Sequence, residues 1–197
     1  MFAYCGNNPV MYMDPTGYFF GDILDKLQTF AKKVVHFVEV TVEAVGLLIN
    51  PTALDYDHDG NNFTTYAGES DMSVIARMLY GEDHDSTEAH MWILENRRIA
   101  GNYGGSDFRT LILADAQFSC MSGSRSLAPG VLLGDPGERE AWYKCVSTAY
   151  LYMLYGMSAF DLPCANFDYT FTHSYSDTFA ARHPDGRRFG GTWFYNR

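Results

Sequence analysis

Apolar residues recur at helical spacing between residues 22 and 49, with charged residues between them. This pattern predicts an amphipathic helix or a pair of helices. Asn50-Pro51 follows, and the residue before a proline disfavours the helical conformation, so we expect the helix to end there. The apolar face either packs on the rest of the chain, which we favour, or contacts a membrane.

Two further helices are predicted between residues 71 and 101. In the first, apolar residues from Met72 to Leu79 form one stripe. Asp71 is its expected N-cap and Gly81 its expected C-terminal stop.

The second helix of this pair has its apolar face at Ala89, Trp92 and Ile93. It is expected to start from Asp85, because Glu88 three residues later would complete a capping box. Gly101 should stop it.

The later part of the chain combines helical and alternating patterns. Helices are expected from Phe108 to Leu113 and from Glu138 to Tyr155, and a strand with alternating side chains from Phe167 to Tyr175. We therefore predict an α+β fold that is mainly helical, with a small C-terminal antiparallel sheet and a preceding linker helix.

Composition and charge narrow the function classes. The chain has 197 residues, of which 47% are hydrophobic, so most of it should pack as one domain with appended segments. Its formal net charge of -10 argues against nucleic acid as a partner, because such binding depends on Lys and Arg displacing counterions. Neither a signal peptide nor a transmembrane helix is expected.

The cysteines and acidic clusters give little sign of a metal site. No Cys-x-x-Cys pair occurs, and Cys120, Cys145 and Cys164 either include a disulfide or are buried free thiols. The start of a calcium loop is present, but position twelve is tyrosine where an EF-hand has glutamate. We favour a polar linker there and expect no metal or cofactor, with calcium as the alternative. The three acidic residues of that loop are Asp55, Asp57 and Asp59.

Glu82 is the candidate catalytic residue. It follows a predicted helix at the negative end of the helix dipole, which disfavours the charged carboxylate, and burial near Tyr80 or Trp92 would act in the same direction. A protonated glutamate suits general acid catalysis. Asn96 and Arg97 end the next helix, and each either ties elements together or faces the same pocket. The alternative for Glu82 is a solvated surface acid.

The first residues, Tyr4-Cys-Gly-Asn-Asn-Pro-Val-Met-Tyr-Met-Asp-Pro-Thr-Gly17, resemble the closing motif of the RHS-repeat core. In that family a shell encloses a variable C-terminal toxin, and self-cleavage follows the Asp-Pro-x-Gly turn. The resemblance implies that Asp14 and Gly17 belong to the autocleavage motif. It also implies that the RHS shell and a cognate immunity protein are partners of this chain.

A second resemblance covers residues 72–195. Ala76-Arg77-x-x-Tyr80-Gly81-Glu82, then Asn96-Arg97, then Gln117-Phe118-Ser119, are similar to the motifs of the SleB-type cell wall hydrolases. These lysozyme-like enzymes cut the glycan strands of peptidoglycan. The chain departs from the family pattern in a shorter connection after Glu82 and in Trp193, where the terminal motif often has histidine.

The SleB resemblance implies that Glu82 is the catalytic acid of a lytic transglycosylase or a muramidase-like enzyme. Sugar-binding roles would fall to Asn96, Arg97 and Gln117, and the alternative for Gln117 is that it caps the helix before it. The predicted strand places Tyr169, Phe171 and His173 on one face, which is either core or an aromatic platform for sugars.

The expected organisation is therefore an RHS end over residues 1–20, a helix and polar linker over 21–70, and the hydrolase domain over 71–197. The expected function is a toxin tip that degrades peptidoglycan after delivery to the envelope of a target bacterium. The alternatives are a toxin tip that acts on RNA, and a non-catalytic module that binds the wall or acts on a membrane.

Overall fold

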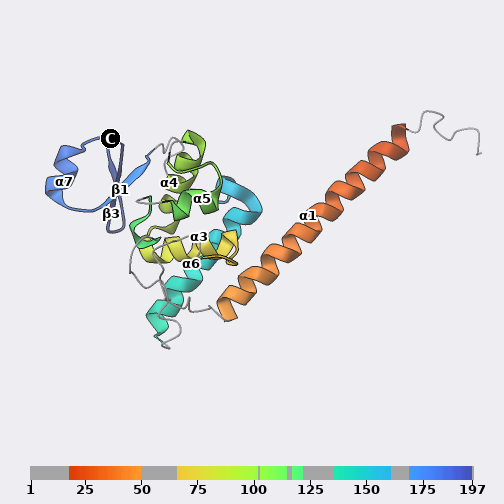
Figure 1. The fold of residues 1–197 in the computed structure, drawn as a ribbon, viewed down its shortest axis with the longest axis horizontal. Coiled ribbons are helices and arrows are strands. Elements are labelled where there is room, and N and C mark those ends of the chain that lie inside the picture. The colour runs from red at the N-terminus through yellow and green to blue at the C-terminus, as the bar shows by residue number, and fades with distance from the viewer. Residues whose placement is uncertain are drawn as a thin grey trace, which may run out of the picture. The chain divides into compact units, whose positions relative to one another are not determined.

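The computed structural model describes residues 18–49, 66–101, 103–114, 117–121, 135–160 and 169–196 (Figure 1). These residues are mostly helical and include a three-stranded antiparallel sheet, so the predicted α+β class is confirmed. The chain forms two compact units, Met1–Glu39 and Val40–Arg197. The residues proposed for the autocleavage motif (Asp14, Gly17) and for the calcium loop (Asp55, Asp57, Asp59) lie outside the described part.

Helix α1, Tyr18–Ile49, is one continuous helix, which decides between the single helix and the helix pair. Its large apolar side chains from Ile23 to Val38 are exposed. Within the second unit, Val40, Ala44 and Leu47 are buried, and the indole Nε1 of Trp142 donates to the Leu47 carbonyl at 2.9 Å. In the described ranges, no helix has the length and apolar character that crossing a membrane requires.

Helix α3, Asp71–Glu82, lies at the centre of the second unit, with eight buried residues from Met72 to Leu79. The prediction that Asp71 is the N-cap was wrong by one position. Ser70 has the extended backbone of a cap, and its hydroxyl accepts from the Ser73 N–H at 3.1 Å. The helix also runs through Gly81, so Glu82 is its last residue rather than the first residue after it.

Helix α4, Thr87–Ala100, ends at Gly101 in the left-handed conformation, as predicted, with φ 71°. Its expected start was wrong. Ser86 is the N-cap, but its side chain makes no capping bond, and its hydroxyl instead donates to Asp83 at 2.8 Å. The predicted capping box of Asp85 and Glu88 therefore does not form.

The remaining helices contribute further side chains to the hydrophobic core. Helix α5, Phe108–Leu113, has its predicted bounds, and the 3-10 helix η3 covers Ser119–Met121. Helix α6, Pro136–Tyr155, begins two residues before the expected Glu138 because Asp135 caps it, and the 3-10 helix η5, Gly156–Ala159, follows. Cys120 and Cys145 are buried free thiols, whereas Cys164 lies outside the described ranges.

The sheet consists of β1 (Phe171–Ser174), β2 (Arg187–Phe189) and β3 (Thr192–Tyr195), in the order β1-β3-β2. Helix α7, Asp177–Arg182, connects β1 to β2. Phe171 pairs with Tyr195, and Ser174 with Thr192.

Strand β1 is shorter than the strand predicted from residue 167 to 175. Residues 167 and 168 are not described. The two residues just before β1, Tyr169 and Thr170, are held in another way, because their carbonyl groups accept from the side chains of Asn96 and Arg97 at 2.9 and 2.8 Å.

Candidate functional site

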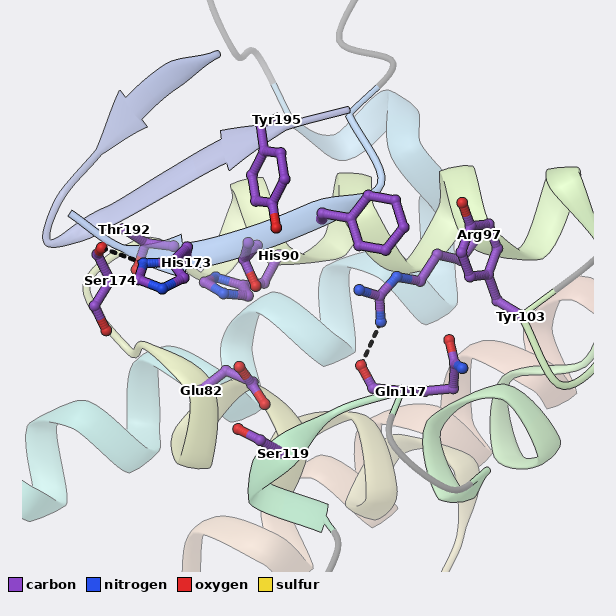
Figure 2. Close-up of a pocket in the computed structure, with 12 residues that line it drawn as sticks. Glu82, His90, Arg97, Tyr103, Gln117, Ser119, His173, Ser174, Thr192 and Tyr195 are labelled. Carbon is purple, nitrogen blue, oxygen red and sulfur yellow. Dashed lines mark hydrogen bonds between the residues drawn. The ribbon is translucent and has the colours of Figure 1, made fainter. Parts of the chain in front are cut away.

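A pocket of about 600 Å³ lies where helices α3 and α4 meet the sheet. Figure 2 shows Glu82 and Ser119 on one side of it, with His90 and Tyr195 opposite. The pocket has the size of a ligand site in an enzyme. It is lined by Glu82, His90, Arg97, Tyr103, Gln117, Ser119, Phe171, Thr172, His173, Ser174, Thr192 and Tyr195.

Glu82 is the last residue of α3, and its side chain lines the pocket. Its Oε1 accepts a hydrogen bond from the backbone N–H of Cys120 at 3.3 Å. Cys120 is fixed in turn, because its thiol is buried and lies 3.6 Å from the Met78 carbonyl, one turn earlier on α3. A backbone N–H therefore binds one oxygen of the Glu82 carboxylate at the pocket.

Arg97 supplies a cation to the pocket although only 6% of its surface is exposed. Its Nε donates to the Thr170 carbonyl at 2.8 Å, and its Nη1 donates to the Gln117 carbonyl. The guanidinium lies over the Phe118 ring at 4.7 Å from the centroid. Burial lowers the pKa of Arg97, and the nearby Glu82 carboxylate acts in the opposite direction. An arginine so far from its titration range stays charged.

His90 lines the same pocket from about two turns before Arg97 on α4 and is 1% exposed. Its Nδ1 lies 3.1 Å from the Ser86 carbonyl. A carbonyl only accepts, so this contact assigns the proton to Nδ1. Burial lowers the pKa of His90, against the opposing charges of Glu82 and Asp83, so the imidazole is neutral at pH 7.

Asp83 stabilises one wall of the pocket through hydrogen bonds. It accepts from the Thr192 hydroxyl at 2.6 Å and from the Ser86 hydroxyl at 2.8 Å, and thereby joins β3 to the α3–α4 connection. Burial raises the pKa of Asp83, but these hydrogen bonds outweigh it, and the pKa lies below its ordinary value. The carboxylate is therefore charged and fully engaged as an acceptor.

The structure brings five of the predicted site residues into the pocket lining: Glu82, Arg97, Gln117, Phe171 and His173. Asn96 and Tyr169 are not among the lining residues. Instead, the Asn96 amide donates to the Tyr169 carbonyl, and the Tyr169 hydroxyl donates to the Asp185 carbonyl. The first contact ties α4 to the segment before β1, as in the alternative in which Asn96 ties elements together, and the second ties that segment to the connection between α7 and β2.

His173 does not stand alone in the pocket. Its ring stacks on Phe179 at 3.9 Å between centroids, and Phe179 stacks on His183 at 4.6 Å. His183 also lies 4.4 Å from Tyr195, which lines the pocket. The late part of the chain therefore forms a stack of aromatic rings beside the pocket. Flat apolar ring faces of this kind suit sugars.

Sequence reasoning missed several lining residues, above all His90, Tyr103, Thr192 and Tyr195. Tyr195 was visible as part of the aromatic closing segment of the chain. No sequence signal marked His90, since a single histidine on a helix is usually part of the core or the surface.

Within the described ranges, no group of three or more His, Cys, Asp and Glu side chains is arranged to hold a metal ion. The pocket instead combines one carboxylate, one neutral imidazole and one buried cation. Such a set can donate and accept protons and can bind a polar or anionic ligand group.

Comparisons with known proteins identify no relative of this chain. No protein-family model, no curated protein and no solved structure matches the chain.

Proposed function

We propose that this chain is an enzyme that cleaves the glycan strands of peptidoglycan, with Glu82 as its general acid. The observation that carries the proposal is the position of Glu82. The one carboxylate among the described lining residues projects into a polar pocket beside a buried arginine and an aromatic stack. The resemblance of residues 72–195 to SleB-type, lysozyme-like hydrolases supports the same assignment.

In the proposed reaction, Glu82 donates a proton to the glycosidic oxygen as the bond to the anomeric carbon breaks. The anomeric carbon gains oxocarbenium character. Arg97 and Gln117 lie where they could bind polar groups of the sugar, and the rings of Phe171 and His173 offer flat faces to it. The nucleophile is water in a muramidase, or the 6-hydroxyl of the same sugar in a lytic transglycosylase, which leaves a 1,6-anhydro end.

The decisive test is digestion of purified peptidoglycan with mass analysis of the fragments. We expect fragments from the parent protein and a loss of at least about 100-fold in rate for Glu82→Gln, because proton donation is removed while the shape is kept. Glu88→Gln is the matched control, since Glu88 is an exposed acid in the first turn of α4. An absence of fragments from the folded parent would refute the proposal.

The same digestion distinguishes the two nucleophiles. Anhydro ends would identify a transglycosylase, and reducing ends a hydrolase. A Glu82→Gln variant as toxic as the parent in the periplasm would instead favour a non-catalytic module that binds the wall or acts on a membrane.

A second candidate is cleavage of RNA. One specific observation favours it: Arg97, His90 and His173 line the pocket that holds Glu82, and a cation with proton-transfer groups is also what phosphodiester cleavage needs. The net charge of -10 counts against this candidate. Incubation with purified RNA at low salt tests it directly.

The biological setting that we propose follows from the RHS-like motif at residues 4–17. The enzyme would be the toxin tip of an RHS-repeat protein, delivered to the envelope of a target bacterium and neutralised in the producing cell by an immunity protein. Co-purification of the toxin with proteins of the producing cell, followed by a test of whether the captured protein protects cells from the toxin, would test the immunity partner.

A further inference from the structure

Three residues that follow the end of α3 form a hydrogen-bonded chain leading into the pocket. The Ser86 hydroxyl lies 2.8 Å from Asp83 Oδ2 and 3.3 Å from His90 Nδ1. A carboxylate held in its charged form can only accept, so the one hydroxyl proton of Ser86 points to Asp83. Ser86 Oγ can then only accept from His90, as the Ser86 carbonyl does at 3.1 Å.

This arrangement determines the tautomer of His90. Both contacts at Nδ1 require a proton there, so the lone pair of the neutral ring is on Nε2. No described residue makes a hydrogen bond to Nε2. The imidazole ring of His90 packs edge-to-face against the Phe194 ring, at 5.2 Å between centroids. A buried, oriented imidazole with a free lone pair thus lines the same pocket as Glu82 (Figure 2).

We propose that His90 is the second proton-transfer group of this site, with Nε2 as the base that accepts the proton of the attacking hydroxyl. The inference rests on the proposed glycan-cleaving function and deepens it. It answers the question that the sequence left open, namely which group accompanies Glu82 when no second carboxylate stands out. Asp83 and Ser86 act through His90 and are positioning residues.

The proton balance of this step is complete. The bond between the anomeric carbon and the glycosidic oxygen breaks, and the leaving oxygen takes the proton of Glu82. The attacking oxygen, from water or from the 6-hydroxyl of the sugar, bonds to the anomeric carbon and gives its proton to Nε2. Glu82 ends as carboxylate and His90 as imidazolium. The proton then returns from His90 to Glu82 through solvent, which restores both groups.

The charged surroundings of His90 suit this role. Glu82 and Asp83, at the end of α3 and just after it, favour the imidazolium that forms, whereas Arg97 on α4 disfavours it. His173 on β1 is the other titratable imidazole that lines the pocket. Because Nε2 must be unprotonated, activity should fall as the pH drops through the pKa of His90.

The main test is peptidoglycan digestion by His90→Gln and His90→Ala, with fold checked by circular dichroism. We expect a loss of at least about 100-fold in kcat, the usual contribution of a general base. Added imidazole should restore part of the activity of His90→Ala, because it can occupy the vacated space as a free base. His84→Gln is the control, since His84 is an exposed histidine in the connection between α3 and α4.

If the His90 variants do not fold, the pH profile of Asp83→Asn tests the role of His90 as a base. In Asp83→Asn, loss of the carboxylate removes a charge that favours the imidazolium, so the acidic limb of kcat/KM should shift to lower pH. A purely structural role of Asp83 would lower activity without moving that limb.

The possible failures can be told apart. Folded His90 variants that retain activity within about threefold of the parent, or that show no rescue by imidazole, would overturn the role of His90 and leave that of Glu82 intact. An unmoved acidic limb in Asp83→Asn would also count against it. If the parent protein released no fragments, both proposals would fall together.

Discussion

Arg97 shows how one side chain can serve both the structure and the pocket. Its guanidinium lies among the rings of Tyr103, Phe118 and Phe171, and two of its nitrogens bind backbone carbonyls of distant segments. One carbonyl belongs to Thr170 before β1 and the other to Gln117 before η3. The planar fork of arginine matches this pair of acceptors, and the ammonium of lysine does not.

We therefore predict that Arg97→Lys lowers the free energy of unfolding by about 2 to 4 kcal/mol, because buried carbonyls lose their donors. Urea titration followed by circular dichroism measures this change. Arg98→Lys is the neighbouring control. Arg98 pairs with Glu95 on its own helix in a partly exposed position, and such pairs contribute about 1 kcal/mol or less. Equal effects of the two substitutions would contradict the tethering role of Arg97.

Residues of the candidate site could be predicted from the sequence only where a charged or polar side chain occupies a position that the apolar pattern of a helix defines. Glu82 and Arg97 stand at helix ends, and their position on the helices follows from the apolar stripe. Thr192 reaches the pocket wall by bonding to Asp83, 109 positions earlier. No periodicity encodes such a contact, since it depends on how the sheet packs against the helices.

At the scale of elements, the connection between α4 and α5 depends on a tight turn at Gly104 and Gly105. Gly104 has φ 105°, and a Cβ there would lie 2.5 Å from the Cβ of Ala114. Tyr103, just before this turn, lines the pocket. The turn therefore sets the position of a pocket residue and leaves no room for a side chain.

We predict that Gly104→Ala lowers the free energy of unfolding by about 1 to 3 kcal/mol, because of backbone strain and the close contact. Gly46→Ala should do the opposite and raise it by about 0.5 to 1 kcal/mol, since Gly46 lies in α1 with no atom within 4 Å of the added Cβ. Thermal unfolding of both variants measures the two shifts. A gain in stability for Gly104→Ala would refute the account of this turn.

Local patterns predicted the elements themselves better than their ends. Helix α5 and the stop of α4 at Gly101 were predicted correctly because apolar spacing and glycine act locally. The starts of α3 and α4 were each misplaced, since a serine next to the expected aspartate occupies the cap position. Which of two neighbouring polar residues caps a helix depends in part on tertiary partners, such as the Glu43 carboxylate, which accepts from the hydroxyl of Ser70.

At the scale of the whole molecule, the division of the chain at residue 39 makes a prediction about truncation. Removal of residues 1–39 should leave the melting temperature of the second unit unchanged, because its core begins with Val40. Removal of residues 1–49 should destabilise it by about 3 to 6 kcal/mol, from the loss of three buried apolar side chains. It would also leave the indole N–H of Trp142 without its acceptor, Leu47. Calorimetry of the two truncated proteins tests this, and equal melting temperatures would contradict it.

The bonds from α4 to the carbonyls before β1 span 73 positions of the chain. Contacts between such distant positions are costly in chain entropy and form late in folding. During synthesis the α3–α4 helices can therefore assemble on the ribosome before β1 and β3 have emerged, while the pocket still lacks one wall. A ribosome-bound chain of this kind already holds Glu82 at the end of α3, but the pocket around Glu82 is complete only after β3, which carries Thr192 and Tyr195, has docked.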